Sequence, residues 1–336
     1  MKPMQRIALL LVLGFLLTGC AQKSPNVVAT MQPVEKSTPT AKLEMVDISG
    51  IDAFNYPRVD GSTSAYPLQI MIACEILDVR CAWTEGDFFS ATRRIAPVES
   101  LLATDEHETI FNLYHNGTHG AYINLIEKNA DLILVAREPS EDELVAAEHA
   151  GVGLNIRPVA LDAFVFLVHT DNPVQSLTLQ QIRDIYAGKI TNWAEVGGLD
   201  AEIHTYQRNP NSGSQELMEK LVMLGETMLD SPDMILMSMM GPFSAIHDDP
   251  QGIGYSVFFY AENIYPDENV RMIAIDEVGP TSQAIAAGNY PLITEVYAVF
   301  REAPQNPALA RDLRDWLLTA EGQNAVEASG YVGMPE

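Results

Sequence analysis

The sequence predicts an α/β fold with two domains, and three observations support this class. Segments with the pattern of strands alternate with segments with the pattern of helices along most of the chain. The run Asp131–Ala136 is apolar from its second residue onward, as in a parallel strand that is buried on both faces. The length of 336 residues is enough for two domains of ordinary size.

The expected elements follow one another from about residue 46. Pro67 lies in the first turn of a helical stretch over residues 68–73, where proline is tolerated. Ser140 begins a later helix and forms a capping box with Glu143. The other expected segments are a helix at 122–127, the strand at 131–136, a long strand at 159–168, a helix at 179–186, strands at 252–257 and 290–300, and a closing helix at 307–328.

Composition and charge restrict the classes of function. Apolar residues make up 47% of the chain and charged residues 19%, which is typical of a globular protein. The net charge of −25 at pH 7 argues against nucleic acid as a partner, since nucleic-acid binding needs a basic face. An anion site remains compatible with this charge, because helix ends and one arginine can dominate the field inside a closed site.

The N-terminus predicts export and a lipid anchor. Lys2 and Arg6 precede the apolar run 7–17, which is too short to span a bilayer and has the layout of a secretory signal. The tetrapeptide Leu-Thr-Gly-Cys that ends at Cys20 resembles the bacterial lipobox, in which cleavage before the cysteine exposes it for lipidation. Loss of residues 1–19 removes two basic residues and no acidic one, which moves the net charge from −25 to −27. Because such acidity repels anionic lipid, attachment would depend on the lipid chain.

Two cysteines remain after Cys20, and export permits a disulfide between them. Cys74 and Cys81 are separated by seven positions, which a continuous helix would hold roughly 10 Å apart, too far for a bond. A disulfide therefore requires the helix to end near residues 77–78. The sequence leaves both the bonded and the free state open.

Three loops that lead into helices are candidate anion sites, at residues 60–67, 114–121 and 208–215. Each combines glycine with hydroxyl side chains before a helix, whose first turn offers free backbone N–H groups and the positive end of the dipole. In the third loop Gly213 permits close approach to a ligand and Arg208 supplies a fork suited to tetrahedral oxyanions. The alternative is that such turns only cap their helices.

In the third loop, Ser212 is the expected N-cap and Gln215 completes a capping box. Glu138 follows the buried strand 131–136, at the end where open α/β sheets bind ligands. An ionised carboxylate only accepts hydrogen bonds, so it suits an oxyanion that carries a proton and opposes one that does not. The alternative is that Glu138 pairs with Arg137 or Arg208 and only orients it. The acidic residues 141–143 are interpreted as surface groups that complement a helix dipole.

Several of these motifs carry a resemblance to a known family. Asp60–Leu68, Ile185–Gly198 and Arg208–Ser214 occur in the same order in phosphate-binding proteins of the PstS type, and the segments 252–255 and 290–292 also resemble that family. The likeness covers roughly residues 55–336. It implies a two-lobed periplasmic-binding-protein-like fold of type II, with two crossover strands and the anion in the cleft.

The resemblance also implies a domain division and a site. The N-terminal sequence itself indicates the signal peptide at 1–19 and, being rich in Ser, Thr, Pro and Lys without apolar periodicity, a flexible tether at 20–45. The resemblance gives one lobe at 46–160 with 298–336, and a second lobe at 161–297. The residues whose positions match the family's phosphate site are Ala65 and Tyr66 at the first helix, Thr118 with His119 beside it in the second turn, Glu138 in place of a proton-accepting Asp, and Arg208, Ser212, Gly213 and Ser214 in the third.

The expected function is a monomeric, lipid-anchored extracytoplasmic protein that captures phosphate and delivers it to the permease of an ABC importer. The alternatives are a surface or signalling lipoprotein that does not transport, and a binder of another oxyanion. The zincin, nucleophile-elbow, Cys-x-x-Cys and phosphate-loop motifs are absent from the sequence. The sequence therefore predicts no enzyme, cofactor or metal.

Overall fold

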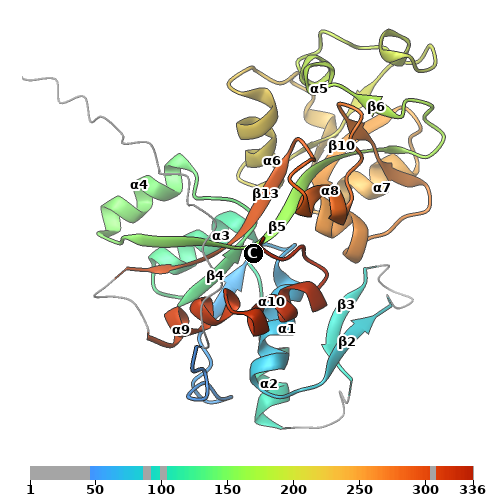
Figure 1. Cartoon of the computed structure of the whole chain (residues 1–336). Coiled ribbons are helices and arrows are strands. Elements are labelled where there is room, and N and C mark those ends of the chain that lie inside the picture. Colours follow the sequence, from blue (N-terminus) through green and yellow to red (C-terminus); the bar gives the residue numbers. More distant parts are fainter. Residues whose placement is uncertain (1–45, 86–91, 99–103, 303–307, 336) are drawn as a thin grey trace, which may run out of the picture. The chain divides into compact units, whose positions relative to one another are not determined.

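The computed structural model describes residues 46–85, 92–98, 104–302 and 308–335. The predicted signal peptide, Cys20 and the predicted tether lie outside these ranges. Residues 39–336 group into a single unit, whose elements are drawn in Figure 1. None of the helices within the described ranges has both the length and the apolarity needed to cross a bilayer.

A mixed seven-stranded sheet runs through this unit, and it confirms the predicted α/β class. The strand order is β1-β4-β13-β5-β10-β7, and β11 also pairs with β5. The bounds are β1 Val59–Gly61, β4 Leu132–Val135, β5 Leu154–His169, β7 His204–Thr205, β10 Gly252–Val257, β11 Val270–Met272 and β13 Ile293–Arg301. β4, which was predicted as a parallel strand, is parallel to β1 and antiparallel to β13. β4 is buried throughout, as its apolar run indicated.

Two long strands connect two groups of elements. Residues 154–163 of β5 pair with β13, whereas residues 164–168 pair with β10. Residues 297–300 of β13 in turn pair with β4. The two strands thus cross from the elements around β4 to the elements around β10, as Figure 1 shows. We call these groups the β4 lobe and the β10 lobe.

The β4 lobe contains six helices and a small hairpin among its described elements. They are α1 Tyr66–Ile76, α2 Asp105–Phe111, α3 Gly117–Ile126, α4 Glu141–Ala150, α9 Ala308–Leu317 and α10 Ala320–Ala328, with β2 Cys81–Thr84 paired to β3 Arg94–Pro97. The prediction of one closing helix at 307–328 is wrong. Thr319 caps α10 by accepting a hydrogen bond from the Gly322 backbone, which starts a second helix.

The β10 lobe holds the remaining described elements. They are β6 Ser176–Leu177, α5 Leu179–Tyr186, β8 Gln207–Arg208, α6 Gly213–Leu217, β9 Ile235–Leu236, α7 Gly241–His247, β12 Ala274–Ile275 and α8 Ser282–Ala286, together with 3₁₀ turns at Trp193–Val196 and Pro232–Met234 and π-helical segments at Met218–Met223 and Tyr260–Ile264. Its core includes the buried rings of Phe166, Tyr186 and Tyr255, whose centroids lie 5.7–6.3 Å apart. This packing fixes Tyr255 beside β8.

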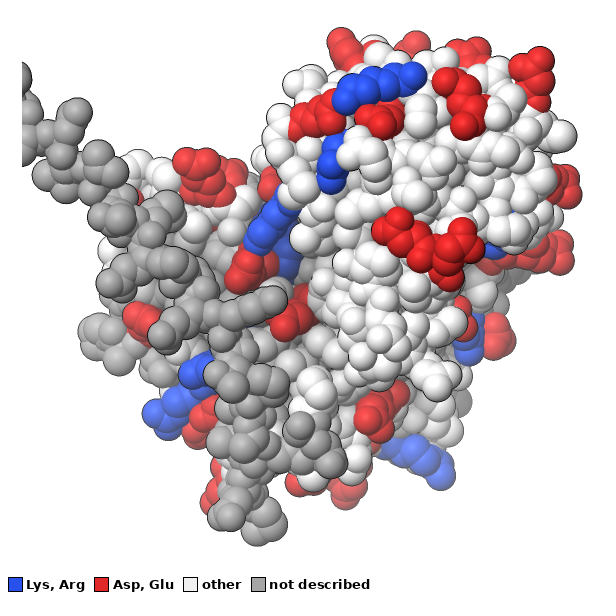
Figure 2. Space-filling view, turned by 45° about the horizontal axis from the view of Figure 1, so that its top comes forward, with Lys and Arg blue, Asp and Glu red and all other residues white. Residues whose placement is uncertain are grey.

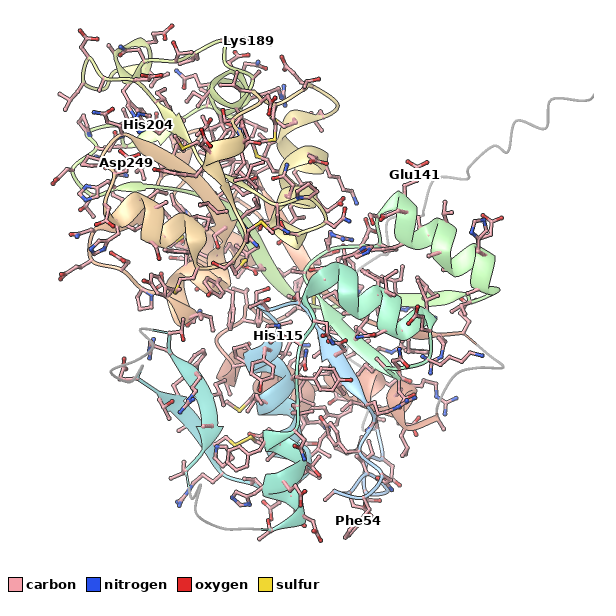
Figure 3. All side chains as sticks on the ribbon, turned by 180° about the vertical axis from the view of Figure 1, so that it is seen from behind. Phe54, His115, Glu141, Lys189, His204 and Asp249 are labelled. Carbon is pink, nitrogen blue, oxygen red and sulfur yellow. A yellow bond between two sulfur atoms is a disulfide. The ribbon has the colours of Figure 1, made fainter. Side chains whose placement is uncertain are left out.

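Acidic side chains outnumber basic ones on the face drawn in Figure 2. Figure 2 shows Asp and Glu side chains scattered over one face, with fewer Lys and Arg among them. Seen from behind, Lys189, His204 and Asp249 lie in the β10 lobe, and Phe54, His115 and Glu141 lie in the β4 lobe (Figure 3). The acidic surface agrees with the net charge of −25.

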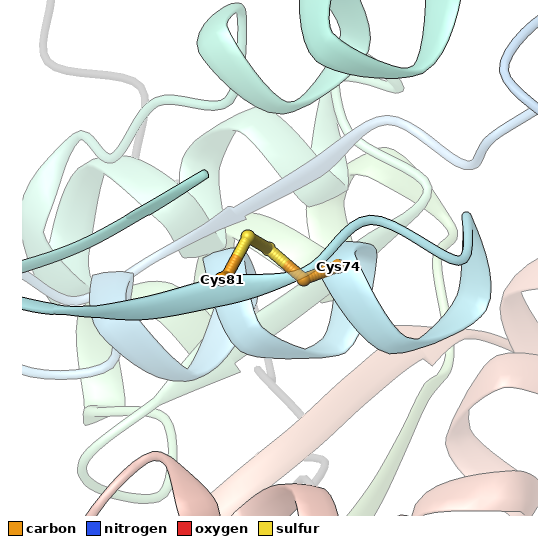
Figure 4. Close-up of a disulfide and its surroundings, with 2 residues drawn as sticks. All are labelled: Cys74 and Cys81. Atoms are coloured by element: carbon orange, nitrogen blue, oxygen red, sulfur yellow. A yellow bond between two sulfur atoms is a disulfide. The ribbon is translucent and has the colours of Figure 1, made fainter. Parts of the chain in front are cut away.

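A disulfide joins Cys74 to Cys81, with the two Cα atoms 6.1 Å apart (Figure 4). The helix that carries Cys74 ends at Ile76, and Asp78 has a positive φ of 53° that turns the chain back. The condition set by the sequence, a helix end near residues 77–78, is therefore met. The bond ties the end of α1 to β2.

Candidate functional site

A cavity of about 720 Å³ lies at the ends of three helices and is lined from both lobes. The β4 lobe contributes residues 62–64 before α1 and residues 115–120 at the start of α3, with Ala136 after β4. The β10 lobe contributes residues from 208–214 and 237–240. His115, labelled in Figure 3, lies on the loop that enters α3. The three loops predicted as anion sites therefore meet at one place.

The cavity differs in charge from the surface around it. Among the described residues that line it, Arg208 carries a charge at every physiological pH, and Asp, Glu and Lys are absent. Most of the other lining groups are hydroxyl, amide or imidazole side chains and the backbone of helix starts. In a chain of net charge −25, such a lining favours an anion.

Arg208 is buried, with 7% of its surface exposed. Its Nε donates to the Leu236 carbonyl at 3.0 Å and its Nη1 to Ser214 Oγ at 3.2 Å. The remaining contacts go to Met239 Sδ and Asn209 Oδ1, so no carboxylate of the described residues pairs with it. Burial lowers the pKa of the guanidinium. A buried cation without an acidic partner is costly, and a bound anion would offset that cost.

The backbone of Arg208 is fixed by the core of the β10 lobe. β8 pairs in parallel with β9, and the Arg208 N–H donates to the Tyr255 hydroxyl at 2.9 Å. The same N–H also reaches Gln215 Oε1 at 3.3 Å. The pairing of β8 and the packed ring of Tyr255 thus hold the backbone from which the guanidinium extends.

The start of α3 is held by a buried carboxylate. Asp60, the fully buried middle residue of β1, accepts hydrogen bonds from the Asn116 backbone at 2.9 Å and side chain at 2.8 Å. The Asn124 amide adds a third contact at 2.7 Å. Gly117 enters the helix with a positive φ of 73°. These contacts hold the start of α3, where Thr118 and His119 line the cavity.

The start of α6 faces α3. Ser212 is the N-cap and accepts from the Gln215 N–H at 3.2 Å, as predicted. The reciprocal half of the expected capping box is wrong, because the Gln215 side chain instead bonds the Tyr255 hydroxyl and Glu219. Ser212, Gly213 and Ser214 line the cavity, as Arg208 does.

The structure does not bring Ala65 and Tyr66 to the cavity. Ala65 is fully buried, and the Tyr66 hydroxyl donates to the Leu113 carbonyl at 3.0 Å. Their backbone N–H groups already donate to Ser62 and Thr63 within the turn. The residues before them, 62–64, line the cavity instead.

Glu138 also lies away from the cavity lining. Its Oε2 is 2.7 Å from Lys220 Nζ, and its side chain is 41% exposed. The preceding Ala136 does line the cavity, so the end of β4 points there although the glutamate does not. The partner of Glu138 is a lysine, whereas the alternative had named an arginine.

Glu143 is a correction to the surface-acid interpretation, since none of its surface is exposed. It completes the predicted capping box with Ser140 and pairs with Arg137 through two hydrogen bonds of 2.8 and 2.9 Å. Its Oε1 also lies 3.0 Å from His119 Nδ1. The buried glutamate thus supports a residue of the cavity wall.

Several lining residues were not singled out from the sequence. His115 has its Nδ1 at 3.3 Å from Thr63 Oγ1, and burial lowers its pKa. Both belong to loops that the sequence had marked as candidates, so their loop position was the available signal. Ser238, Met239 and Met240 line the opposite wall, and no sequence motif marks them.

Comparison with known proteins assigns the family. The model of the PBP superfamily domain matches residues 98–321, which is more than half of the chain. The chain belongs to the PBP superfamily. Within the described ranges of this PBP superfamily member, no three His, Cys, Asp or Glu side chains gather into a group that could hold a metal ion.

Relatives and solved structures of the PBP superfamily agree with this assignment. The chain is 26% identical over 262 residues to the phosphate-binding protein PstS of Staphylococcus epidermidis, covering 72% of this chain and 77% of the relative. The match to PstS of Borreliella burgdorferi is 25% identical and spans 52% of this chain but only 64% of that protein. The resemblance to PstS-type proteins is thereby confirmed.

The fold is shared with solved structures. A Clostridium perfringens substrate-binding protein with bound phosphate has a TM-score of 0.60 and 24% identity, covering 82% of this chain and 98% of that one. An ABC-type phosphate transport receptor from Vibrio cholerae has a TM-score of 0.58 and 22% identity, with coverage of 82% and 98%. These likenesses confirm the two-lobed α/β fold.

Proposed function

We propose that this chain is an extracytoplasmic binding protein that captures inorganic phosphate in the cavity and delivers it to an ABC importer. The observation that carries the proposal is the buried Arg208, without an acidic partner among the described residues. It lies in a cavity whose described lining has no Asp or Glu, within a strongly acidic chain. The PstS names of the relatives support phosphate as the anion.

In the proposed complex, Arg208 gives charge-assisted hydrogen bonds to the phosphate oxygens. The hydroxyls of Thr118, Ser212 and Ser214 and the backbone N–H groups at the starts of α3 and α6 supply further donors. Residues 62–64 take the place that the sequence had given to Ala65 and Tyr66. Residues 46–160 with 298–336 form one lobe and residues 161–297 the other, and both contact the anion.

The proposal includes the site of action. Cys20 is lipidated after removal of residues 1–19, and the segment 20–45 tethers a monomeric binding domain to the membrane. Phosphate passes from the cavity to the permease subunits of the importer. The relatives are named for binding rather than for catalysis, so the proposal assigns no reaction, cofactor or metal to the chain.

Calorimetric titration of the phosphate-free protein with phosphate, arsenate and sulfate tests this function. We expect saturable binding of phosphate, lost in Arg208→Ala and retained in Arg311→Ala, a matched control on the exposed face of α9. Preference for another oxyanion would favour the alternative ligand on the same lobes. If the protein binds phosphate but a strain that lacks its gene still takes up phosphate normally, the result would favour the surface or signalling lipoprotein.

A further inference from the structure

The inference concerns how the cavity distinguishes phosphate from sulfate, and it rests on the proposed function. Near neutral pH phosphate carries at least one proton, and inside a site closed to water that proton needs an acceptor. Among the phosphate ligands named above, Arg208 and the backbone N–H groups can only donate. Glu138, the acceptor expected from the sequence, pairs with Lys220 and does not line the cavity.

A buried ion pair lies behind the cavity wall. Arg137 and Glu143 are both buried and share two hydrogen bonds of 2.8 and 2.9 Å. The Ser140 backbone donates to the same carboxylate at 2.9 Å. Both oxygens of the Glu143 carboxylate accept from N–H donors in these contacts, and a carboxylate can only accept hydrogen bonds.

This carboxylate selects one tautomer of the neutral ring of a histidine on the cavity wall. His119 Nδ1 lies 3.0 Å from Glu143 Oε1, so Nδ1 must carry a proton to make that contact. In the neutral ring the other nitrogen, Nε2, is then an acceptor. His119 lines the cavity with 32% of its side chain exposed, and no described residue hydrogen-bonds its Nε2.

Other polar groups of the lining lack such a fixed role. Hydroxyl groups can rotate to donate or to accept, and asparagine amides can present either end. His115 has its Nδ1 against the Thr63 hydroxyl, which itself can donate or accept, so its tautomer is not determined by that contact. Among these lining residues, His119 has a buried carboxylate at Nδ1 that leaves Nε2 of the neutral ring as the acceptor.

We propose that His119 Nε2 accepts the hydrogen bond from the P–OH group of bound hydrogen phosphate and thereby selects protonated oxyanions over sulfate. Sulfate would place an unprotonated oxygen against the lone pair of Nε2. Glu143, supported by Arg137, acts as the positioning residue that holds the tautomer. Among the described residues, the carboxylates within 4 Å of Nδ1 are Glu143 at 3.0 Å and Asp142 at 3.9 Å. Arg137 pairs with Glu143, Glu216 interacts electrostatically with both, and Arg208 also lines the cavity.

The test compares phosphate and sulfate titrations of the full chain for wild type, His119→Ala and His119→Gln. We expect a strong phosphate preference in wild type that falls by about 10- to 100-fold in both variants, because the glutamine amide can rotate to donate to sulfate. His149→Ala, an exposed histidine at the end of α4, is the matched control and should keep the wild-type ratio. An unchanged ratio in both His119 variants, with phosphate still bound, overturns this inference and leaves the proposed function in place.

A second measurement needs no variant. In the phosphate complex, ¹⁵N NMR of His119 should show a protonated Nδ1 and an unprotonated Nε2. A proton on Nε2, or wild-type protein that binds sulfate as well as phosphate, contradicts the proposal. Absence of phosphate binding in wild type instead overturns the proposed function itself. The two failures are therefore distinguishable.

Discussion

A Cβ atom on Gly213 would lie 2.5 Å from the Thr118 hydroxyl oxygen. The two residues begin helices of different lobes, α6 and α3, and both line the cavity. The glycine therefore permits a close approach between two helix starts whose donors face the same space. Any side chain at position 213 must displace the hydroxyl that the proposal assigns to phosphate.

Gly213→Ala should weaken phosphate binding by about 5- to 30-fold, since a lost hydrogen bond of this kind is worth about 1–2 kcal/mol. The melting temperature of the phosphate-free protein should change little, because the Thr118 side chain can rotate away. Calorimetry and thermal melting measure the two effects. Gly279→Ala is the matched control, since a Cβ at Gly279 meets nothing within 4 Å. Equal affinities in the two variants would refute the assignment of Thr118.

Arg208→Ala should cost about 2–5 kcal/mol of phosphate binding, the range for removing one partner of a buried charged pair. In the phosphate-free protein, Arg208→Met should not lower the stability of the fold, because the variant removes a buried cation that has no acidic partner among the described residues. Its melting temperature should equal or exceed that of wild type. A large loss of stability in the phosphate-free state would show that Arg208 serves the fold rather than the ligand.

The sequence predicted elements whose signals are local. The helix at 179–186 and the strand at 252–257 have the predicted bounds, because a capping threonine and a short apolar run flanked by glycine are readable in the chain. Ser212 as an N-cap is a signal of the same kind. The three loops of the candidate site were found because each joins glycine and hydroxyls to the start of a helix.

What the sequence could not predict is where side chains point after packing. Glu143 has the local pattern of an exposed first-turn acid, yet it is buried against Arg137. Glu138 follows a strand as a cleft residue would, yet it pairs with Lys220, which is distant in sequence. Both outcomes depend on partners brought close by the tertiary fold, which no periodicity records.

Reduction of the disulfide should destabilise the protein. Cys74 and Cys81 close a loop of seven positions, for which chain entropy gives a stabilisation of about 2–3 kcal/mol. Wild type should melt at a lower temperature when reductant is added, whereas Cys74→Ser with Cys81→Ser should melt at that lower temperature with or without it. Phosphate affinity should persist, because the cavity residues 62–64 lie before the start of α1, whereas the disulfide is at the other end of that helix. Insensitivity of wild type to reductant would contradict the bond.

Asp162 predicts a specific dependence of stability on pH. It lies in the middle of the crossover strand β5 and is almost completely buried. Its Oδ1 accepts hydrogen bonds from the backbone of Ala163 and Phe259, and its Oδ2 has no partner among the described residues. Burial raises the pKa of this carboxyl to about 7, in spite of the two N–H donors.

The sign follows from proton binding. The unfolded chain has a pKa near 3.9 for this residue, so between about pH 4 and pH 7 only the folded protein holds the proton. The contribution of Asp162 to the free energy of unfolding is therefore full below about pH 4 and is lost as pH rises to about 7, with a slope of up to about 1.4 kcal/mol per pH unit. Asp162→Asn, which cannot ionise, should gain stability relative to wild type over this range. Urea unfolding at several pH values measures the difference, and Asp230→Asn at an exposed position should show none. A difference between Asp162→Asn and wild type that stays constant with pH would mean that the buried carboxyl does not titrate there.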